Sequence, residues 1–190
     1  MINILLADDH PYLRRGLAQI LTDEFPGAVI GEASNAPELL EQAQKQRWDV
    51  VVLDLNMPGR GGLEALHELK RLCPSLPVLV LSMYPEDQFA VRVLRAGGAG
   101  YLTKESAPQE LVHAIKAIWK GGKYITPKAA ELLAAHVHQH GDSEQPLHSS
   151  LSDREYQVFS LIAAGSTITD ISDQLSLSVK TISTYRSRIL

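Results

Sequence analysis

The chain has 190 residues, of which 45% are hydrophobic and 21% are charged, and its formal net charge is −4. This composition is typical of a globular protein with one ordinary domain and a smaller one, and it does not by itself indicate a nucleic-acid binder. No apolar stretch approaches the length that crosses a bilayer. Cys73 is the sole cysteine, which excludes an internal disulfide, and no signal peptide precedes Asp8, so we expect a cytoplasmic protein.

Residues 1–122 alternate short apolar segments with amphipathic ones. We expect strands at 2–7, 28–33, 50–54, 77–82 and 100–103. We expect helices near 11–23, 36–46, 63–72, 86–96 and 108–120. Strands that alternate with helices predict an α/β fold with a doubly wound, five-stranded parallel sheet. The order that we expect is 2-1-3-4-5, as in flavodoxin and CheY.

Residues 123–150 have the composition of a linker that contains one helix. Thr126-Pro127 is a helix-start signal, and a polar segment with several serines follows from residue 136. His136 and His140 stand four residues apart, as two metal ligands on a helix do. No carboxylate or cysteine completes such a site, so a solvated histidine-rich tract is the preferred interpretation.

Residues 151–190 predict a small all-α domain. Ser152 and Glu155 have the spacing of a capping box, which begins a helix. Two further helices are expected at 169–175 and 179–190, joined by the three residues 176–178. This spacing is that of a helix-turn-helix.

Polar side chains follow four of the predicted strands: Asp8 and Asp9, Asp54, Ser82, and Lys104. An aspartate at one strand end is more often only a turn or cap residue. In the order 2-1-3-4-5, however, strands 1 and 3 flank the switch point, so the three aspartates converge there. Packed carboxylates repel one another unless a proton or a cation is bound, and their oxygens suit Mg²⁺.

Two kinds of chemistry remain open for this cluster. One is a dry carboxylate pair that works as general acid and base. The other is phosphoryl transfer, which Lys104 favours because an ammonium beside a bound metal stabilises the phosphoryl oxygens. In that mechanism Asp54 attacks phosphorus in line, Mg²⁺ bridges the two groups, and Lys104 and Ser82 contact the remaining oxygens.

Four segments of the first domain resemble the receiver domain of two-component response regulators: ADDHP at 7–11, LDLNMPG at 53–59, LS at 81–82 and GYLTK at 100–104. The segments LSDRE at 151–155 and LSVKTI at 177–182 resemble the LuxR-type helix-turn-helix. The whole chain apart from the linker therefore resembles the NarL/FixJ class. The resemblance implies a sensor histidine kinase as partner, double-stranded DNA as target, and a homodimer on activation.

The resemblance also implies roles for individual residues. Asp54 is the phosphoacceptor, Asp9 a direct Mg²⁺ ligand, Asp8 a ligand mainly through water, and Asn56 a ligand through its main-chain carbonyl. It further implies that Ser82 and one aromatic residue form the switch pair that carries the signal.

That aromatic residue is Tyr101, whose ring turns inward while the Ser82 hydroxyl moves to the phosphoryl group. An ordinary half-buried aromatic is an equally good interpretation of Tyr101, because position alone does not show motion.

The helix predicted at 179–190 carries the residues expected to contact DNA. Three small polar side chains suit base edges, and three basic ones suit phosphates. These residues are Ser183, Thr184 and Ser187 for the bases, and Lys180, Arg186 and Arg188 for the backbone. LuxR-type domains usually continue into a fourth helix that dimerises, which the sequence to Leu190 does not include, so we expect weak DNA affinity for this chain.

The function that the sequence favours is that of a phosphorylation-controlled transcription factor, and it has three alternatives. A phosphohydrolase of the haloacid dehalogenase type needs an Asp-x-Asp nucleophile after strand 1, and Asp8-Asp9-His10 lacks it. A flavodoxin-like carrier needs a phosphate-binding loop at that place, where two acids would repel phosphate. A regulator that acts through protein interfaces without phosphate also remains open. We expect no turnover enzyme, only self-phosphorylation and slow dephosphorylation.

Overall fold

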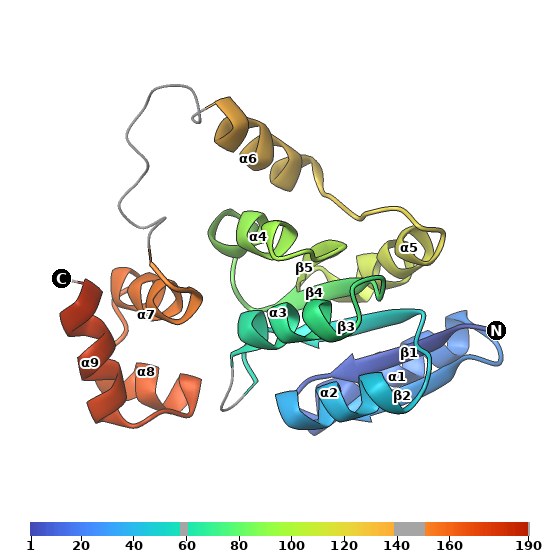
Figure 1. Cartoon of the computed structure of the whole chain (residues 1–190), viewed down its shortest axis with the longest axis horizontal. Coiled ribbons are helices and arrows are strands. Elements are labelled where there is room, and N and C mark those ends of the chain that lie inside the picture. Colours follow the sequence, from blue (N-terminus) through green and yellow to red (C-terminus); the bar gives the residue numbers. More distant parts are fainter. Residues whose placement is uncertain (58–60, 139–150, 190) are drawn as a thin grey trace. The chain divides into compact units, whose positions relative to one another are not determined.

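The computed structural model describes residues 1–57, 61–138 and 151–189 (Figure 1). Its contacts divide the chain into two compact units, Met1–Ala130 and Glu131–Leu190. Residues 139–150 of the expected linker, the turn at 58–60 and Leu190 lie outside the described residues, as does His140 of the histidine tract. The first unit extends eight residues beyond the boundary expected at 122, because the segment that follows packs on it.

The first unit is an α/β fold around a five-stranded parallel sheet in the order β2-β1-β3-β4-β5, which confirms the expected topology. Its strands are β1 Asn3–Ala7, β2 Val29–Ala33, β3 Val50–Asp54, β4 Val78–Ser82 and β5 Gly100–Thr103. Its helices are α1 Pro11–Glu24, α2 Ala36–Lys45, α3 Gly62–Leu72, α4 Glu86–Arg95 and α5 Ala107–Trp119.

The core lies on both faces of this sheet. Every residue of β3 and β4 is buried, as is typical of central strands in a parallel sheet. Apolar residues of α1 and α5 pack together against one face of β1, β3 and β4. The helices α2, α3 and α4 belong to the opposite face (Figure 1). The sheet is therefore closed on both sides, and its carboxyl edge remains available for a site.

Local signals begin and end these helices. Pro11 occupies the first turn of α1, and the Asn35 side chain accepts a hydrogen bond from the Glu38 amide at the start of α2. Gly97 has a φ of +91° just beyond α4, a left-handed conformation that glycine adopts without strain.

The helix α6 runs from Pro127 to His138. Thr126 caps its first turn, since the Ala129 amide donates to the Thr126 hydroxyl at 3.1 Å. The helix start predicted at Thr126-Pro127 is confirmed.

The second unit contains α7 Asp153–Ala163, α8 Ile168–Leu175 and α9 Val179–Ile189. The predicted capping box at Ser152 and Glu155 is formed. A second one, between Thr167 and Asp170, begins α8 and was not predicted. The three helices pack around Val158, Leu161, Ile171, Leu175 and Ile182, all of which are buried. Among the described residues, no helix is both long and apolar enough to cross a membrane.

Candidate functional site

Two carboxylates and one ammonium meet at the carboxyl edge of the sheet. The parallel register pairs Ala7 with Leu53, so Asp8 and Asp54 follow on adjacent strands. The Nζ of Lys104, just after β5, lies 2.8 Å from the Oδ2 of Asp54 and 2.8 Å from the Oδ2 of Asp8. Asp8 and Asp54 are 3% and 1% exposed, so these charges interact with little screening by water.

Burial and charge act in opposite directions on these groups. Burial raises the pKa of Asp54 to about 6, although the Lys104 ammonium lowers it; the Asp8 carboxylate raises it further. Burial alone would lower the pKa of Lys104, but the carboxylates of Asp54 and Asp8 more than compensate, so this pKa lies above its usual value. Lys104 therefore stays charged, whereas ionised Asp54 needs more positive charge than Lys104 supplies.

The backbone around Asp54 is held closely. The Asn56 amide donates to the Asp54 Oδ1 at 3.0 Å, and the Gly62 amide donates to the Leu55 carbonyl at 3.0 Å. A Cβ at Gly62 would collide with the Leu55 Cα and the Asp54 carbonyl oxygen. Only glycine allows α3 to begin this close to the phosphoacceptor candidate.

Arg14 helps to position Asp8, a role that was not predicted from the sequence. The Arg14 guanidinium on α1 donates to the Asp8 carbonyl oxygen at 2.7 Å and to Glu32 on β2 at 2.7 Å. Arg14 thus ties the end of β1, with Asp8, to α1 and β2. The sequence contains no signal for this contact, since it depends on how α1 lies over the strands.

The described residues Asp8, Asp9, His10 and Asp54 offer four ligand atoms that lie within 4.8 Å of one another. Three buried oxygens, Asp8 Oδ2, Asp9 Oδ1 and Asn56 Oδ1, accept no hydrogen bond, although Asp8 Oδ2 has its ion-pair contact with Lys104. Carboxylate and amide oxygens are the donors that a hard divalent cation prefers. These residues fit such a cation.

The predicted switch residues lie next to the site in β4 and β5. Ser82 is fully buried, and its hydroxyl accepts a hydrogen bond from the Tyr84 amide at 3.1 Å. Tyr101 is 2% exposed, and its hydroxyl donates to the Tyr84 carbonyl at 2.6 Å. The Tyr101 ring is therefore fully buried here, not half-buried, and its motion stays a prediction.

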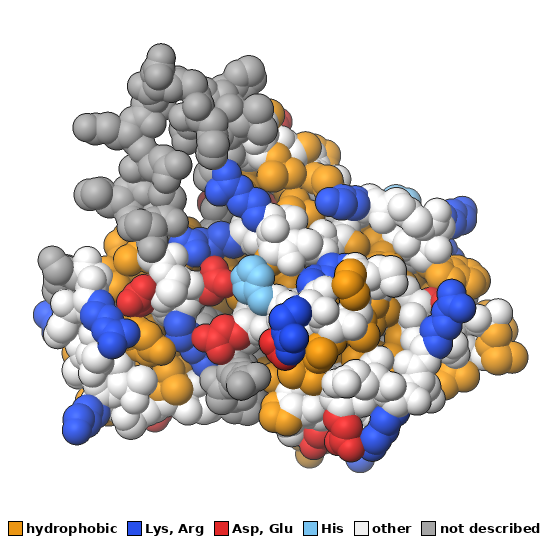
Figure 2. All heavy atoms as spheres, viewed as in Figure 1, with side chains coloured by type: hydrophobic (Ala, Val, Ile, Leu, Met, Phe, Trp, Pro, Cys, Tyr) orange, Lys and Arg blue, Asp and Glu red, His pale blue; other side chains and the backbone are white. Residues whose placement is uncertain are grey.

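The second unit presents α9 with its polar side outward. Lys180, Thr184, Arg186, Ser187 and Arg188 are exposed, Ser183 is half-buried, and Ile182 packs inside. Figure 2 shows blue Lys and Arg side chains over α9 at the left of the view. The six residues predicted to contact DNA thus lie on one short helix, and their contacts with DNA stay a prediction.

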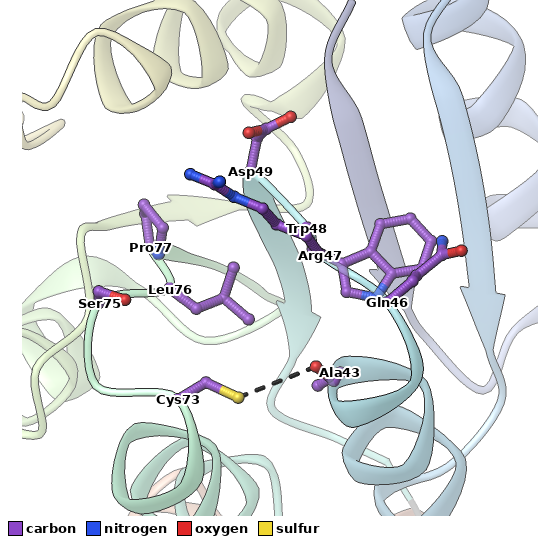
Figure 3. A pocket seen from close by; sticks show the side chains of 9 residues that line it. All are labelled: Ala43, Gln46, Arg47, Trp48, Asp49, Cys73, Ser75, Leu76 and Pro77. Atoms are coloured by element: carbon purple, nitrogen blue, oxygen red, sulfur yellow. Dashed lines mark hydrogen bonds between the residues drawn. The ribbon is translucent and has the colours of Figure 1, made fainter.

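A pocket of about 310 Å³ lies at the other end of the sheet, where β3 and β4 begin (Figure 3). Trp48, Asp49 and Cys73 are among its lining residues, and the Cys73 thiol points to the Ala43 carbonyl, 3.9 Å away. Because Asp54 stands at the carboxyl end of β3, this pocket is separate from the carboxylate site.

Two known families match the two units of the chain. Residues 4–116 match the response regulator receiver domain. Residues 149–190 match the bacterial regulatory proteins of the luxR family. The chain belongs to the response regulators. As predicted from the sequence, this response regulator combines a receiver domain with a LuxR-type helix-turn-helix.

Similar proteins cover this response regulator from end to end. Response regulator UvrY of Escherichia coli K12 is 39% identical over 189 residues, which are 100% of this chain and 86% of UvrY. Response regulator GacA of Pseudomonas aeruginosa PAO1 is 41% identical over 189 residues, 100% of this chain and 88% of GacA.

Solved structures agree with the fold. RcsB of Salmonella enterica serovar Typhimurium, bound to the promoter rprA with the phosphomimetic BeF₃⁻, superposes with a TM-score of 0.66 at 29% identity. It covers 100% of this response regulator and 90% of its own chain. A LuxR-family response regulator from Aurantimonas sp. SI85-9A1 has a TM-score of 0.64 at 36% identity over 72% of this chain and 97% of its own.

Proposed function

We propose that this response regulator is a transcription factor controlled by phosphorylation of Asp54. A sensor histidine kinase supplies the phosphoryl group, Mg²⁺ is the cofactor, and the change controls dimerisation and DNA binding. The observation that carries this proposal is the buried contact of one ammonium, Lys104, with both Asp54 and Asp8 beside oxygens that accept no hydrogen bond. The two carboxylates carry more negative charge than the single positive charge of Lys104 balances, so the site favours a further cation.

The residues divide the work of phosphoryl transfer among themselves. The Asp54 carboxylate attacks phosphorus as the bond to the kinase histidine nitrogen breaks, which produces an acyl phosphate. The imidazole leaves with the electron pair of that bond, and it leaves as a neutral histidine because its other nitrogen carries a proton. Lys104 and the Ser82 hydroxyl donate to the phosphoryl oxygens, and Asp9, Asp8 and the Asn56 backbone would hold Mg²⁺. Bound Mg²⁺ supplies positive charge to the phosphoryl oxygens.

The route from the site to the output begins at β4. Movement of Ser82 toward a phosphoryl group would release the Tyr84 amide, and the Tyr84 carbonyl holds the Tyr101 hydroxyl. Phosphorylation therefore shifts the population of conformations of α4 and β5. Because these elements form the edge of the receiver, the shift changes the surface that favours dimers or frees the helix-turn-helix.

On DNA, α9 is the element that enters the major groove. Each of its three hydroxyls donates to a carbonyl one turn earlier: Ser183 to Val179, Thr184 to Lys180 and Ser187 to Ser183. These hydroxyls are therefore available first as acceptors, and the amino groups of adenine and cytosine are the donors that the major groove offers. The basic residues of α9 contact phosphates.

RcsB supports this proposal by analogy. Its solved structures include the complex with promoter rprA and BeF₃⁻ and a complex of two RcsB dimers with two parallel DNAs. In the same way, we propose that this chain acts as a homodimer on DNA in the cytoplasm. It turns over no substrate beyond its own acyl phosphate.

The test treats the wild-type chain and Asp54→Asn with Mg²⁺ and acetyl phosphate, then measures molar mass by light scattering and binding to a random pool of duplex DNA. We expect phosphorylation to shift wild type toward dimers and to strengthen its weak DNA binding, with no such response in Asp54→Asn. An equal response in both proteins would instead support a regulator that works without phosphate.

A further inference from the structure

His10 lies at the carboxylate cluster, and neither the receiver mechanism nor helix capping uses its side chain. It is the N-cap residue of α1, but its side chain makes no capping hydrogen bond. Its Nδ1 instead points to the two acids before it, 2.8 Å from the Asp9 Oδ1 and 3.3 Å from the Asp8 Oδ1. An otherwise exposed imidazole thus presents one nitrogen to the cluster.

The contact between His10 and Asp9 is not a hydrogen bond. The Asp9 Oδ1 is buried and accepts no hydrogen bond, although the His10 Nδ1 is only 2.8 Å away. The two atoms are at contact distance without the alignment of a hydrogen bond, as two ligands of one metal ion are. Asp8 differs, because its Oδ1 accepts a hydrogen bond from the His10 amide at 2.8 Å and its Oδ2 contacts the Lys104 ammonium.

The spacing of the four ligand atoms in this cluster suits a single metal ion. The ligand atoms of Asp8, Asp9, His10 and Asp54 lie within 4.8 Å of one another. Ligand atoms bound at about 2.1 Å from one metal lie up to about 4.2 Å apart, so small side-chain rotations bring all four to one ion. Among the described residues, Lys104 is the ammonium in contact with Asp8 and Asp54, and a divalent cation would add the positive charge that these carboxylates need.

We propose that His10 is a metal ligand through Nδ1 and raises the affinity of this site for Mn²⁺ and the other transition-metal ions relative to its affinity for Mg²⁺. This inference rests on the metal-binding part of the proposed function. Imidazole is a common ligand of transition-metal ions, whereas Mg²⁺ prefers oxygen ligands and keeps several of its waters. The nitrogen of His10 therefore adds affinity for Mn²⁺ that three carboxylates alone do not provide.

The probe is MnCl₂ with the full chain. The histidines of the 136–148 tract would also bind transition metals, so the background for every protein carries glutamine at these four positions: His136, His138, His140 and His148. Electron spin-echo modulation of bound Mn²⁺ detects a ligating ¹⁴N directly. Calorimetry measures the dissociation constants of Mn²⁺ and Mg²⁺ in the same proteins.

His10→Gln is compared with His113→Gln, which removes a histidine on α5 whose ring packs edge-on against Tyr124 at 5.9 Å. We expect ¹⁴N modulation in the background protein and in His113→Gln, and none in His10→Gln. We also expect His10→Gln to lower the ratio of Mn²⁺ to Mg²⁺ affinity by at least about tenfold, the smallest loss usual for a metal site that loses a supporting group.

The outcomes separate the two proposals. Mn²⁺ that binds the background protein without ¹⁴N modulation would overturn the role of His10 and leave the carboxylate site intact. An unchanged ratio of Mn²⁺ to Mg²⁺ affinity in His10→Gln would also overturn the role of His10. Failure of both Mn²⁺ and Mg²⁺ to bind the background protein would overturn the metal site itself, and with it the Mg²⁺-dependent part of the proposed function.

Discussion

Asp54 is a carboxylate whose charge the fold does not fully compensate. Burial favours its protonated form, and the contact with Lys104 opposes burial without cancelling it, so its pKa rises from 3.8 to about 6. A nucleophile must be ionised to attack phosphorus. A cation that binds next to Asp54 would therefore stabilise its ionised form, which is the form that the proposed attack on phosphorus requires.

This imbalance predicts a pH-dependent gain in stability for Asp54→Asn in metal-free buffer. Because the folded protein binds this proton more tightly than the unfolded chain, the free energy of unfolding falls as pH rises from about 4 through 6. Asparagine does not ionise, so the substitution removes this loss of stability at high pH. We expect Asp54→Asn to be more stable by about 1–3 kcal/mol at pH 7.5 and by little at pH 4.5.

Urea denaturation in EDTA at the two pH values measures this difference. Asp49→Asn is the control, a carboxylate at the opposite end of β3 that accepts a hydrogen bond from the Asn3 amide. A metal-free Asp54→Asn protein less stable than wild type at pH 7.5 would mean that Lys104 compensates fully for burial, contrary to this account.

Residue-scale predictions from the sequence succeeded where strand ends alone decide the geometry. Asp8, Asp54 and Lys104 meet because parallel strands end at one edge, and that follows from strand order. The contacts of Arg14 and the direction of the His10 side chain depend on the rotation of α1 about its axis. No local pattern in the sequence specifies that rotation, so they were missed.

At the scale of elements, the start of α6 is attached to the receiver. The Thr126 hydroxyl donates to the Glu86 carboxylate on α4 at 2.6 Å, and Lys128 lies 3.8 Å from Asp87. Tyr124 donates to Glu110 on α5 at 2.9 Å. The segment that leads out of the receiver is thus held by α4 and α5, the helices beside the predicted switch.

The Thr126 hydroxyl makes two hydrogen bonds: it accepts from the Ala129 amide, which caps α6, and it donates to the Glu86 carboxylate. Thr126→Val keeps the shape of the side chain and removes both hydrogen bonds, whereas Thr126→Ser keeps both. We expect Thr126→Val to lose about 1–2 kcal/mol of local stability and Thr126→Ser to lose little. Hydrogen exchange at the Ala129 and Ala130 amides measures this loss, and equal protection in both variants would show that the hydroxyl does not hold α6.

Local sequence patterns predict where helices and strands lie, but they do not predict how distant segments pack together. The α-helices and strands appear within a few residues of their predicted bounds, because apolar periodicity and caps such as Ser152 are local signals. The capping box of Thr167 and Asp170 was equally local and was overlooked, which placed the start of α8 one residue late. The packing of Tyr124 on the receiver is not local, since it pairs with Gly100 far earlier in the chain.

At the scale of the whole molecule, two units with different tasks share one chain. The receiver unit has the buried carboxylates, and the helix-turn-helix unit has the exposed basic helix. The phosphorylation and the DNA binding that we propose therefore belong to separate parts of the sequence, and a change of conformation or of oligomeric state would connect them. This division makes the phosphoacceptor the first claim to test.

The most direct measurement is the intact mass of the protein after incubation with Mg²⁺ and acetyl phosphate. It is run on wild type, on Asp54→Asn and on wild type with EDTA. The account predicts one added phosphoryl group on wild type with Mg²⁺ and none on the other two samples. An adduct on Asp54→Asn, or its absence from wild type with Mg²⁺ present, would contradict the assignment of Asp54 as the phosphoacceptor.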